Sequence, residues 1–248
     1  MTNSKLQTSE QQEHDQSSLN ESEPNQSGPN QSGPNQSGPN HSGPNQSGPN
    51  HSGRDQQREP KLQAPGAGIP KLELLIAKHI IFPMRFKNTS VATAIAEFRD
   101  ESDKILQLAR ELSIDQLSER RLIPRLQGLE DSSRFWSIAM TMEHLAIVGG
   151  GTRGVLLALS RNQTNLPRRG TADVKPSVDL DVQRMLTRFE EVVSDFIRTA
   201  EKIDYDKFPE ARHPHPWFGP LTAKQWLMFA APHQKIHRRQ IEEIKARL

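Results

Sequence analysis

The sequence predicts an all-α protein, a four-helix bundle preceded by a disordered N-terminal tail. The first 65 residues consist largely of polar residues, Pro and Gly, with a short repeat inside them. Residues 66–248 instead contain four long runs in which apolar side chains recur every three or four positions, as on one face of a helix. No convincing alternation of apolar and polar residues indicates a β-strand. Long amphipathic helices without strands are typical of a helical bundle.

The tail, residues 1–65, is expected to stay disordered. From Gln26 to Gly53 the unit Gln/His-Ser-Gly-Pro-Asn repeats with a period of five, which belongs to no folded repeat architecture. Apolar side chains are missing from these repeats, so little offsets the entropy that ordering them would cost. We therefore place the domain boundary at about Pro65, with a tail of net charge −3 and a domain, residues 66–248, of net charge +5.

The helices of the domain follow from its apolar spacing. A short amphipathic helix is predicted over residues 72–80, stopped near Pro83. A long helix is predicted over about 89–112, and residues 113–131 are expected to be a connection. Further long helices are predicted over about 132–160 and 179–203. The last begins at Thr222, where Gln225 three positions later completes a capping box.

The link between the second and third long helices bears on topology. It spans roughly 17 residues and could reach about 55 Å when extended, whereas a helix of about 25 residues is near 38 Å long. The link can therefore cross the whole bundle. We expect up-down-down-up connectivity rather than a simple meander.

Three histidines are the predicted metal ligands. His233 and His237 both fall on the apolar face of the last helix, and a spacing of four puts their Cβ atoms roughly 5 to 6 Å apart. His144 lies on the apolar face of the second long helix, at a similar depth. One inward histidine is usually a hydrogen-bonded core residue, but three buried imidazoles would need three donors, and a dication satisfies all three at once. Three nitrogen ligands leave one coordination position open.

Composition excludes other classes of site. The chain has no cysteine, so it has no disulfide, thiolate ligand or cysteine nucleophile. No dense basic stripe interleaved with aromatic residues predicts nucleic-acid binding. The N-terminus lacks an apolar signal segment, and no apolar run is long enough to span a membrane. We expect a soluble, cytoplasmic protein with neither nucleic acid nor membrane as a partner.

Three motifs resemble the DinB/YfiT-like metalloenzyme family. They are Trp-Ser-x-x-x-x-x-Glu-His-Leu over 136–145, His-Pro-Trp-Phe-Gly-Pro-Leu-Thr over 215–222, and His-x-x-x-His over 233–237. The likeness covers about 180 residues and omits the tail. It implies a four-helix bundle, a zinc or nickel ion on His144, His233 and His237, and frequent homodimers. Some relatives use a low-molecular-weight thiol cofactor in transfer or isomerisation reactions, and this sequence resembles a branch without assigned activity.

The resulting hypothesis is a metal-dependent hydrolase or thiol-dependent transferase or isomerase that acts on a small molecule. The metal would activate water or the thiol by lowering its pKa. His215 either contacts substrate and assists proton transfer or is merely a loop residue beside Pro214 and Pro216. Two other interpretations stay open: a non-catalytic metal-stabilised bundle that binds another protein, and a metal-free bundle. Imidazole ligands do not distinguish zinc from nickel, iron or copper.

Overall fold

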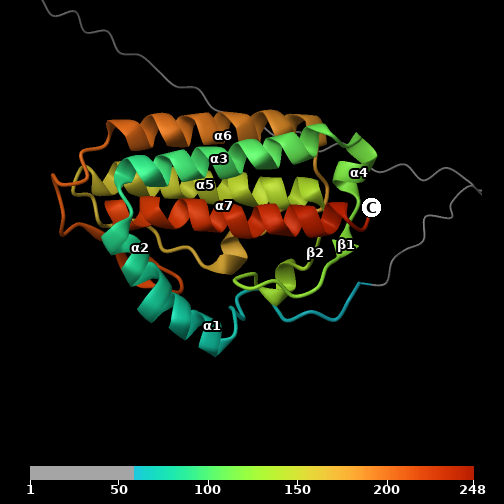
Figure 1. Cartoon of the computed structure of the whole chain (residues 1–248), viewed down its shortest axis with the longest axis horizontal. Helices are drawn as coiled ribbons and strands as arrows, with labels where there is room; N and C mark the ends of the chain where they lie inside the picture. Colours follow the sequence, from blue (N-terminus) through green and yellow to red (C-terminus); the bar gives the residue numbers. More distant parts are fainter. Residues whose placement is uncertain (1–58) are drawn as a thin grey trace, which may run out of the picture. The chain divides into compact units, whose positions relative to one another are not determined.

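The computed structural model describes residues 59–248, and the part of the predicted tail before Glu59 lies outside the described residues. Four long helices lie side by side (Figure 1): α3 (Val91–Arg110), α5 (Ile138–Leu159), α6 (Val182–Lys202) and α7 (Ala223–Lys245). The predicted four-helix bundle is therefore confirmed. Within residues 59–248, every helix is too short or too polar to cross a membrane.

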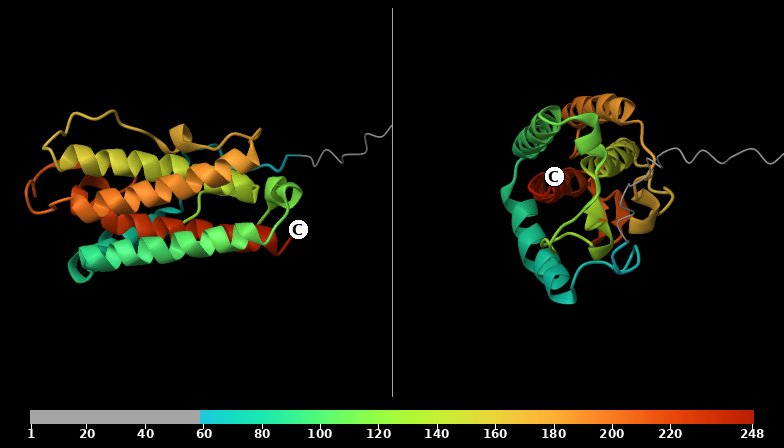
Figure 2. Two further views of the ribbon diagram at one scale, coloured as in Figure 1. Left: turned by 90° about the horizontal axis from the view of Figure 1, so that it is seen from above. Right: turned by 90° about the vertical axis from the view of Figure 1, so that its right-hand side faces the viewer.

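Ion pairs between helices give their directions. Glu101 of α3 pairs with Arg238 of α7, and Glu111, later along the chain, pairs with Lys245 near the end of α7. Since both partners advance together, α3 and α7 run parallel. They are neighbours in the bundle although they are the first and last of its long helices (Figure 2).

The helices α5 and α6 are the second parallel pair. Glu143 of α5 lies near Arg188 of α6. Further along both helices, Arg153 of α5 lies near Asp195 of α6. Contacts between α3 and α6 run in the opposite sense, through the pairs Arg99–Glu201 and Arg110–Glu190. The connectivity is thus up-down-down-up, as predicted. The chain between α5 and α6 returns along the bundle and contains one 3₁₀ turn, η3 (Thr171–Val174). We call residues 160–181 the crossover.

Pro83 does not stop the first helical segment, so that prediction was wrong. The chain stays helical through α1 (Lys71–Ile76), a π-helical turn η1 (Ala77–Ile81) and α2 (Phe82–Asn88). The π turn widens the helix just before Pro83 and lets α2 begin there. In the first turn of a helix the missing N–H of proline costs nothing. The segment forms an arm on the side of the bundle (Figure 1).

The second long helix starts six residues later than predicted. In place of the first predicted turns are η2 (Asp131–Ser133) and β2 (Phe135–Trp136), and β2 pairs antiparallel with β1 (Arg121–Leu122). A short helix, α4 (Ile114–Ser118), precedes β1 in the predicted connection. The start of α5 is decided by Ser137, whose hydroxyl accepts the Met140 N–H as an N-cap. Apolar spacing alone could not locate this cap.

A β-hairpin leads into α7. It is formed by β3 (Arg212–His215) and β4 (Gly219–Thr222). The predicted capping box is present: the Thr222 hydroxyl accepts the Gln225 N–H at 3.3 Å, and Gln225 Oε1 accepts the Thr222 N–H at 2.9 Å. These bonds fix where α7 begins and hence the depth of His233 and His237 in the bundle.

The core is closed by aromatic packing and by one close helix approach. Phe98 of α3 and Phe196 of α6 stack with ring centroids 4.2 Å apart. Between α5 and α6, a Cβ added at Gly149 would lie 3.1 Å from Val192 Cγ1, whereas one at Gly150 would meet nothing within 4 Å. The close approach therefore accounts for Gly149 but not for its neighbour.

Candidate metal centre

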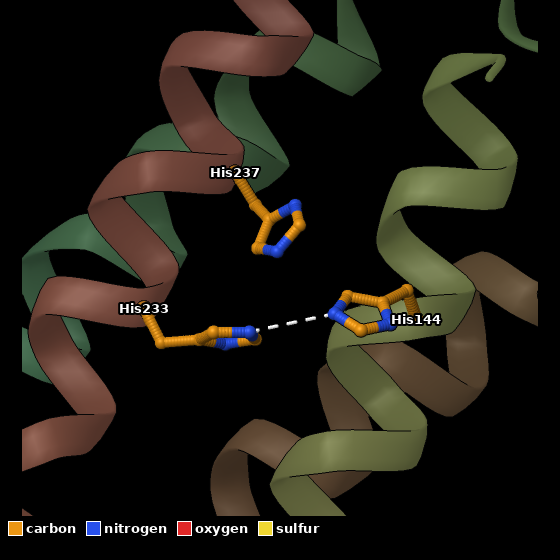
Figure 3. Close-up of side chains that lie close together, drawn as sticks. All are labelled: His144, His233 and His237. Carbon is orange, nitrogen blue, oxygen red and sulfur yellow. Dashed lines mark hydrogen bonds between the residues drawn. The ribbon is translucent and has the colours of Figure 1, made fainter. Parts of the chain in front are cut away.

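The structure brings the three predicted ligands together. His233 and His237 project from successive turns of α7 toward His144, which faces them from α5 (Figure 3). The Nε2 atoms of His144 and His233 are 3.4 Å apart, and one ligand atom from each of the three residues lies within 4.8 Å of the others. Two distant stretches of chain thus converge on one point inside the bundle.

Burial keeps these rings neutral. His144 is 8% exposed and His237 is 4% exposed, while His233 remains partly accessible. Desolvation lowers the pKa of His144 to about 4, and it lowers the pKa of His233 and His237 well below their usual value. Each ring would also repel a charge on its neighbours. Neutral imidazole is the form that binds a metal ion.

Hydrogen bonds to groups outside the cluster fix the orientation of two of the rings, His144 and His237. His144 Nδ1 lies 2.7 Å from the Val174 carbonyl oxygen, which can only accept. The proton of His144 is therefore on Nδ1, and its Nε2 carries a free lone pair.

The second ring, that of His237, is oriented by the side-chain amide of Gln240. His237 Nδ1 lies 2.7 Å from Gln240 Oε1, and Gln240 Nε2 donates to the Ser133 carbonyl at 2.7 Å. The second bond fixes which end of the amide faces His237, so this ring also holds its proton on Nδ1. Its Nε2 is then a free acceptor, as in His144. Orienting partners of this kind are usual around metal-binding histidines.

Trp136 packs against both oriented rings. Its ring centroid is 5.3 Å from that of His144 and 6.2 Å from that of His237, and the planes of Trp136 and His237 are nearly parallel, at 7°. The indole limits how far either imidazole can rotate. Trp136 thus contacts both rings from β2, before α5 begins.

The donor set fits a divalent metal ion. Two ligands at about 2.0 to 2.1 Å in a tetrahedral site would lie about 3.4 Å apart, close to the 3.4 Å between His144 Nε2 and His233 Nε2. The three neutral nitrogens suit zinc, nickel, iron and copper. A direct His233-to-His144 hydrogen bond is the metal-free alternative at the same distance.

Glu143, next to His144 in the chain, and the candidate residue His215 both lie outside the cluster. The Glu143 carboxylate accepts the Ser177 N–H at 2.7 Å, and this hydrogen bond connects α5 to the crossover. His215 packs in an aromatic group with its ring centroid 4.5 Å from that of Phe229 and 4.9 Å from that of Phe218. Phe229 in turn stacks on His233 with centroids 6.1 Å apart. His215 is thus one ring removed from the candidate ligands.

Sequence reasoning missed the partners that orient the rings. Gln240 had a local signal, a polar residue three positions after His237 on the same buried side of the helix, and it is fully buried. The Val174 carbonyl had none, because every residue has a backbone oxygen and only the path of the crossover selects this one.

Residues 97–241 match the family model described as the DinB superfamily. The chain belongs to the DinB superfamily. All three candidate ligands lie in the matched region, whereas the arm and the chain before it do not. The superfamily match thus covers most of the bundle and all of its histidine cluster.

The chain is similar to two further proteins, one by sequence and one by structure. One is the uncharacterized protein YuaE of Bacillus subtilis (strain 168), which is 25% identical over 146 residues covering 50% of this chain and 90% of YuaE. The other is TT2238, described as a four-helix bundle protein, whose crystal structure matches with a TM-score of 0.45 at 24% identity. That match covers 62% of this chain and 98% of TT2238.

Proposed function

We propose that this DinB superfamily protein is a metal-dependent enzyme whose ion is held by His144, His233 and His237. The observation that supports it is the convergence of three neutral rings, two of them with their free lone pairs on Nε2. A divalent cation with three nitrogen ligands supplies Lewis acidity at its open position, which lowers the pKa of water or of a low-molecular-weight thiol. Zinc and nickel are the proposed ions.

The residues around the cluster define what a small-molecule substrate would meet. His144 and His237 are hydrogen-bonded through Nδ1 to Val174 and Gln240, which cover that side of the two rings. A substrate is therefore expected to reach the metal on the side of the partly exposed His233. The rings of Phe229 and His215 lie on that side and form an aromatic wall. A substrate with an apolar part next to its reacting group would suit this surface.

His215 is suited to donate a hydrogen bond. Its Nδ1 accepts the Trp217 N–H at 3.2 Å, which leaves the proton of the neutral ring on Nε2. Burial lowers the pKa of His215 to about 3, so the ring is neutral at physiological pH. We therefore propose that His215 orients a substrate acceptor atom through Nε2–H, and it is too weak a base to remove a proton efficiently.

The first experiment measures metal content. Protein purified without a nickel column is analysed for metals, as the natural sequence and as His233→Ala. The matched control is His79→Ala, which removes an exposed histidine on the arm. One metal ion per chain, lost in His233→Ala and kept in His79→Ala, is the expected result. Metal content that is substoichiometric and unchanged by His233→Ala would favour the metal-free bundle.

A second experiment separates an enzyme from a non-catalytic interaction module. An enzyme needs an exchangeable ligand at the open position, whereas a module could fill that position with a fourth protein side chain. In cobalt-substituted protein, the visible spectrum is expected to change when a small thiol is added. A spectrum that does not respond at saturating thiol would favour the module. Homodimer formation and a cytoplasmic location stay predictions beside this proposal.

A further inference from the structure

The carboxylate of Glu130 joins three separate parts of the chain. The residue is 6% exposed, and its Oε1 accepts the backbone N–H groups of Gly66 and Gly68 at 3.1 and 3.0 Å and the Thr171 hydroxyl at 3.3 Å. Its Oε2 accepts the Ser132 hydroxyl at 2.8 Å and lies 3.3 Å from Lys175 Nζ. Five donors on one buried carboxylate form a fully satisfied network, the kind that fixes geometry most firmly.

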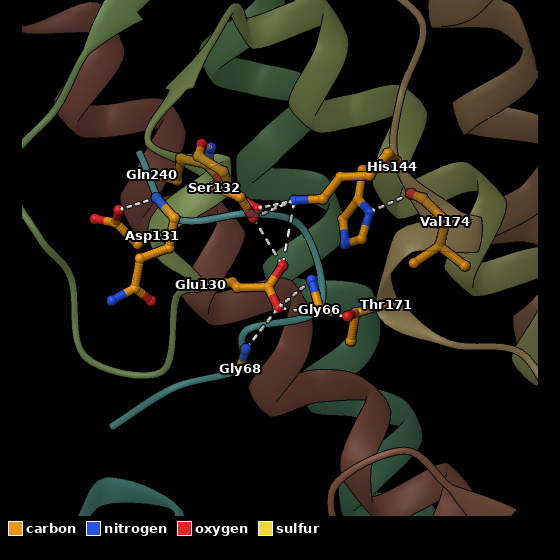
Figure 4. Close-up of polar contacts among 12 residues, drawn as sticks. Gly66, Gly68, Glu130, Asp131, Ser132, His144, Thr171, Val174 and Gln240 are labelled. Atoms are coloured by element: carbon orange, nitrogen blue, oxygen red, sulfur yellow. Dashed lines mark hydrogen bonds and ion pairs between the residues drawn. The ribbon is translucent and has the colours of Figure 1, made fainter. Parts of the chain in front are cut away.

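The first part is the chain between the tail and the arm. Gly66 and Gly68 both have positive φ, +91° and +79°, a conformation that glycine adopts without strain. This conformation turns both N–H groups toward Glu130 (Figure 4). Next to it, the Gln63 N–H donates to Asp131 at 2.8 Å. We call residues 63–68 the linker. Its described part before Gly66 was predicted to be tail, yet it is bonded to the bundle.

The second part is the crossover. Lys175 Nζ donates to the hydroxyls of Ser132 at 2.6 Å and Ser133 at 3.1 Å besides facing Glu130. These contacts use its three hydrogens, so Lys175 acts as a tether and not as a ligand-binding cation. Lys175 directly follows Val174, whose carbonyl orients His144. Tethering Lys175 therefore holds that carbonyl in a segment that has little secondary structure.

The third part is η2 itself. Ser133, which meets Lys175 through its hydroxyl, accepts Gln240 Nε2 through its carbonyl, and Gln240 orients His237. The contacts that set the tautomers of His144 and His237 thus both lead back to residues 130–133. In Figure 4, Gly66 and Gly68 of the linker and Thr171 of the crossover all lie against the Glu130 carboxylate.

We propose that Glu130 is a positioning residue of the metal centre, and that through it the linker contributes to metal affinity. The inference rests on the proposed metal site but goes beyond it, because the linker lies outside the region matched by the DinB superfamily model. In the free protein the network holds the rings in the binding geometry, so less ordering remains to be done when the ion binds. Weakening the network is then expected to weaken metal binding although no ligand is touched.

The central test compares zinc affinity in full-length Glu130→Gln and Glu101→Gln by chelator competition. Glutamine keeps the shape of each side chain but removes its charge. Glu101 is a matched control because it is 8% exposed and pairs with Arg238 at 2.5 Å, without contacting the linker or the crossover. We expect zinc binding about tenfold weaker in Glu130→Gln and unchanged in Glu101→Gln, although both changes remove a buried ion pair.

A second variant tests the linker without altering the bundle. In Gly66→Ala/Gly68→Ala, side chains at two positive-φ positions strain the turn that presents both N–H groups. We expect zinc affinity to fall in this variant too. Combined with Glu130→Gln it should fall little further, because both changes break the same contact. In metal-free Glu130→Gln, amide exchange is expected to rise in peptides covering 63–68 and 171–177.

The outcomes separate this inference from the metal centre itself. If the natural chain binds one zinc ion and Glu130→Gln binds it equally well, the positioning role is wrong while the metal centre stands. An equal loss in Glu101→Gln would also overturn it, since general destabilisation would then explain both. If the natural chain binds no zinc or nickel, both proposals fail together.

Discussion

Gln240 Oε1 lies 2.7 Å from His237 Nδ1, one turn further along α7, and the same amide holds the Ser133 carbonyl. Gln240→Ala removes both bonds from a fully buried position. We expect metal affinity to fall by roughly 10- to 100-fold, because the His237 ring loses its orienting partner. The free energy of unfolding of the metal-free protein should fall by about 1 to 3 kcal/mol. Chelator competition and urea unfolding measure the two effects.

The control for this change is Gln234→Ala. Gln234 is a buried glutamine of the same helix, 3% exposed, but it is bonded to none of the three rings. Truncating it leaves a similar gap. Its metal affinity is therefore expected to stay within about twofold of the natural chain, and an equal loss in the two variants would contradict the orienting role of Gln240.

Gln234 is itself expected to tolerate an apolar replacement. Among residues 59–248, its Oε1 is buried without a hydrogen-bond partner. Gln234→Met keeps the approximate volume and removes that acceptor, so the free energy of unfolding should stay the same or rise by about 1 kcal/mol. Thermal unfolding measures it. A loss above about 1 kcal/mol would reveal a partner that the described contacts do not include.

The stability of the metal-free protein should depend on pH through His215. Burial lowers the pKa of this ring to about 3 in the folded chain, while the unfolded chain keeps an ordinary value near 6.5. Below pH 6.5 the unfolded state therefore takes up a proton that the folded state does not, and stability falls as the pH falls. His215→Phe should lose roughly 2 kcal/mol less than the natural chain between pH 7 and pH 5. Identical losses in urea unfolding would exclude this contribution.

Neighbouring glycines of α5 should respond differently to alanine. Gly150 is exposed and has open space around it, so Gly150→Ala is expected to stabilise the protein by about 0.5 to 1 kcal/mol. At Gly149 the added methyl meets Val192 at 3.1 Å, which should cancel that gain. In a Val192→Ala background the gain at Gly149 should return. Thermal unfolding of Gly150→Ala, Gly149→Ala, Gly149→Ala/Val192→Ala and the Val192→Ala parent measures these changes in stability.

Apolar periodicity was sufficient to predict the bundle, because apolar side chains recur at helical spacing in each long helix, although the first turn of α5 is buried on every side. The length of the crossover was sufficient to predict the connectivity. The start of α5 and the continuation of the arm through Pro83 were missed for local reasons. An N-cap at Ser137 and a π turn before Pro83 are decided by hydrogen bonds that leave the apolar spacing unchanged.

The three candidate ligands could be predicted because each lies on the buried face of a long helix, where a polar side chain needs a partner. Their supporting contacts could not. Glu130 and Lys175 lie in segments without helical periodicity, and the carbonyls of Val174 and Ser133 carry no sequence signal. Only the folded path of the crossover and the linker brings these groups together.

Because α5 and α6 run parallel, the carbonyl that orients His144 belongs to a connection and not to a helix. The two halves of that connection should therefore differ in their tolerance of insertions. Residues 161–170, mostly exposed, precede η3 and can absorb an added residue at the surface. Between Lys175 and Asp181, the N-cap of α6, the chain is tied at both ends. An insertion there would have to be accommodated between two fixed points and would strain Lys175, which holds the Val174 carbonyl in place. Length variation in this protein is therefore expected to be confined to the first half.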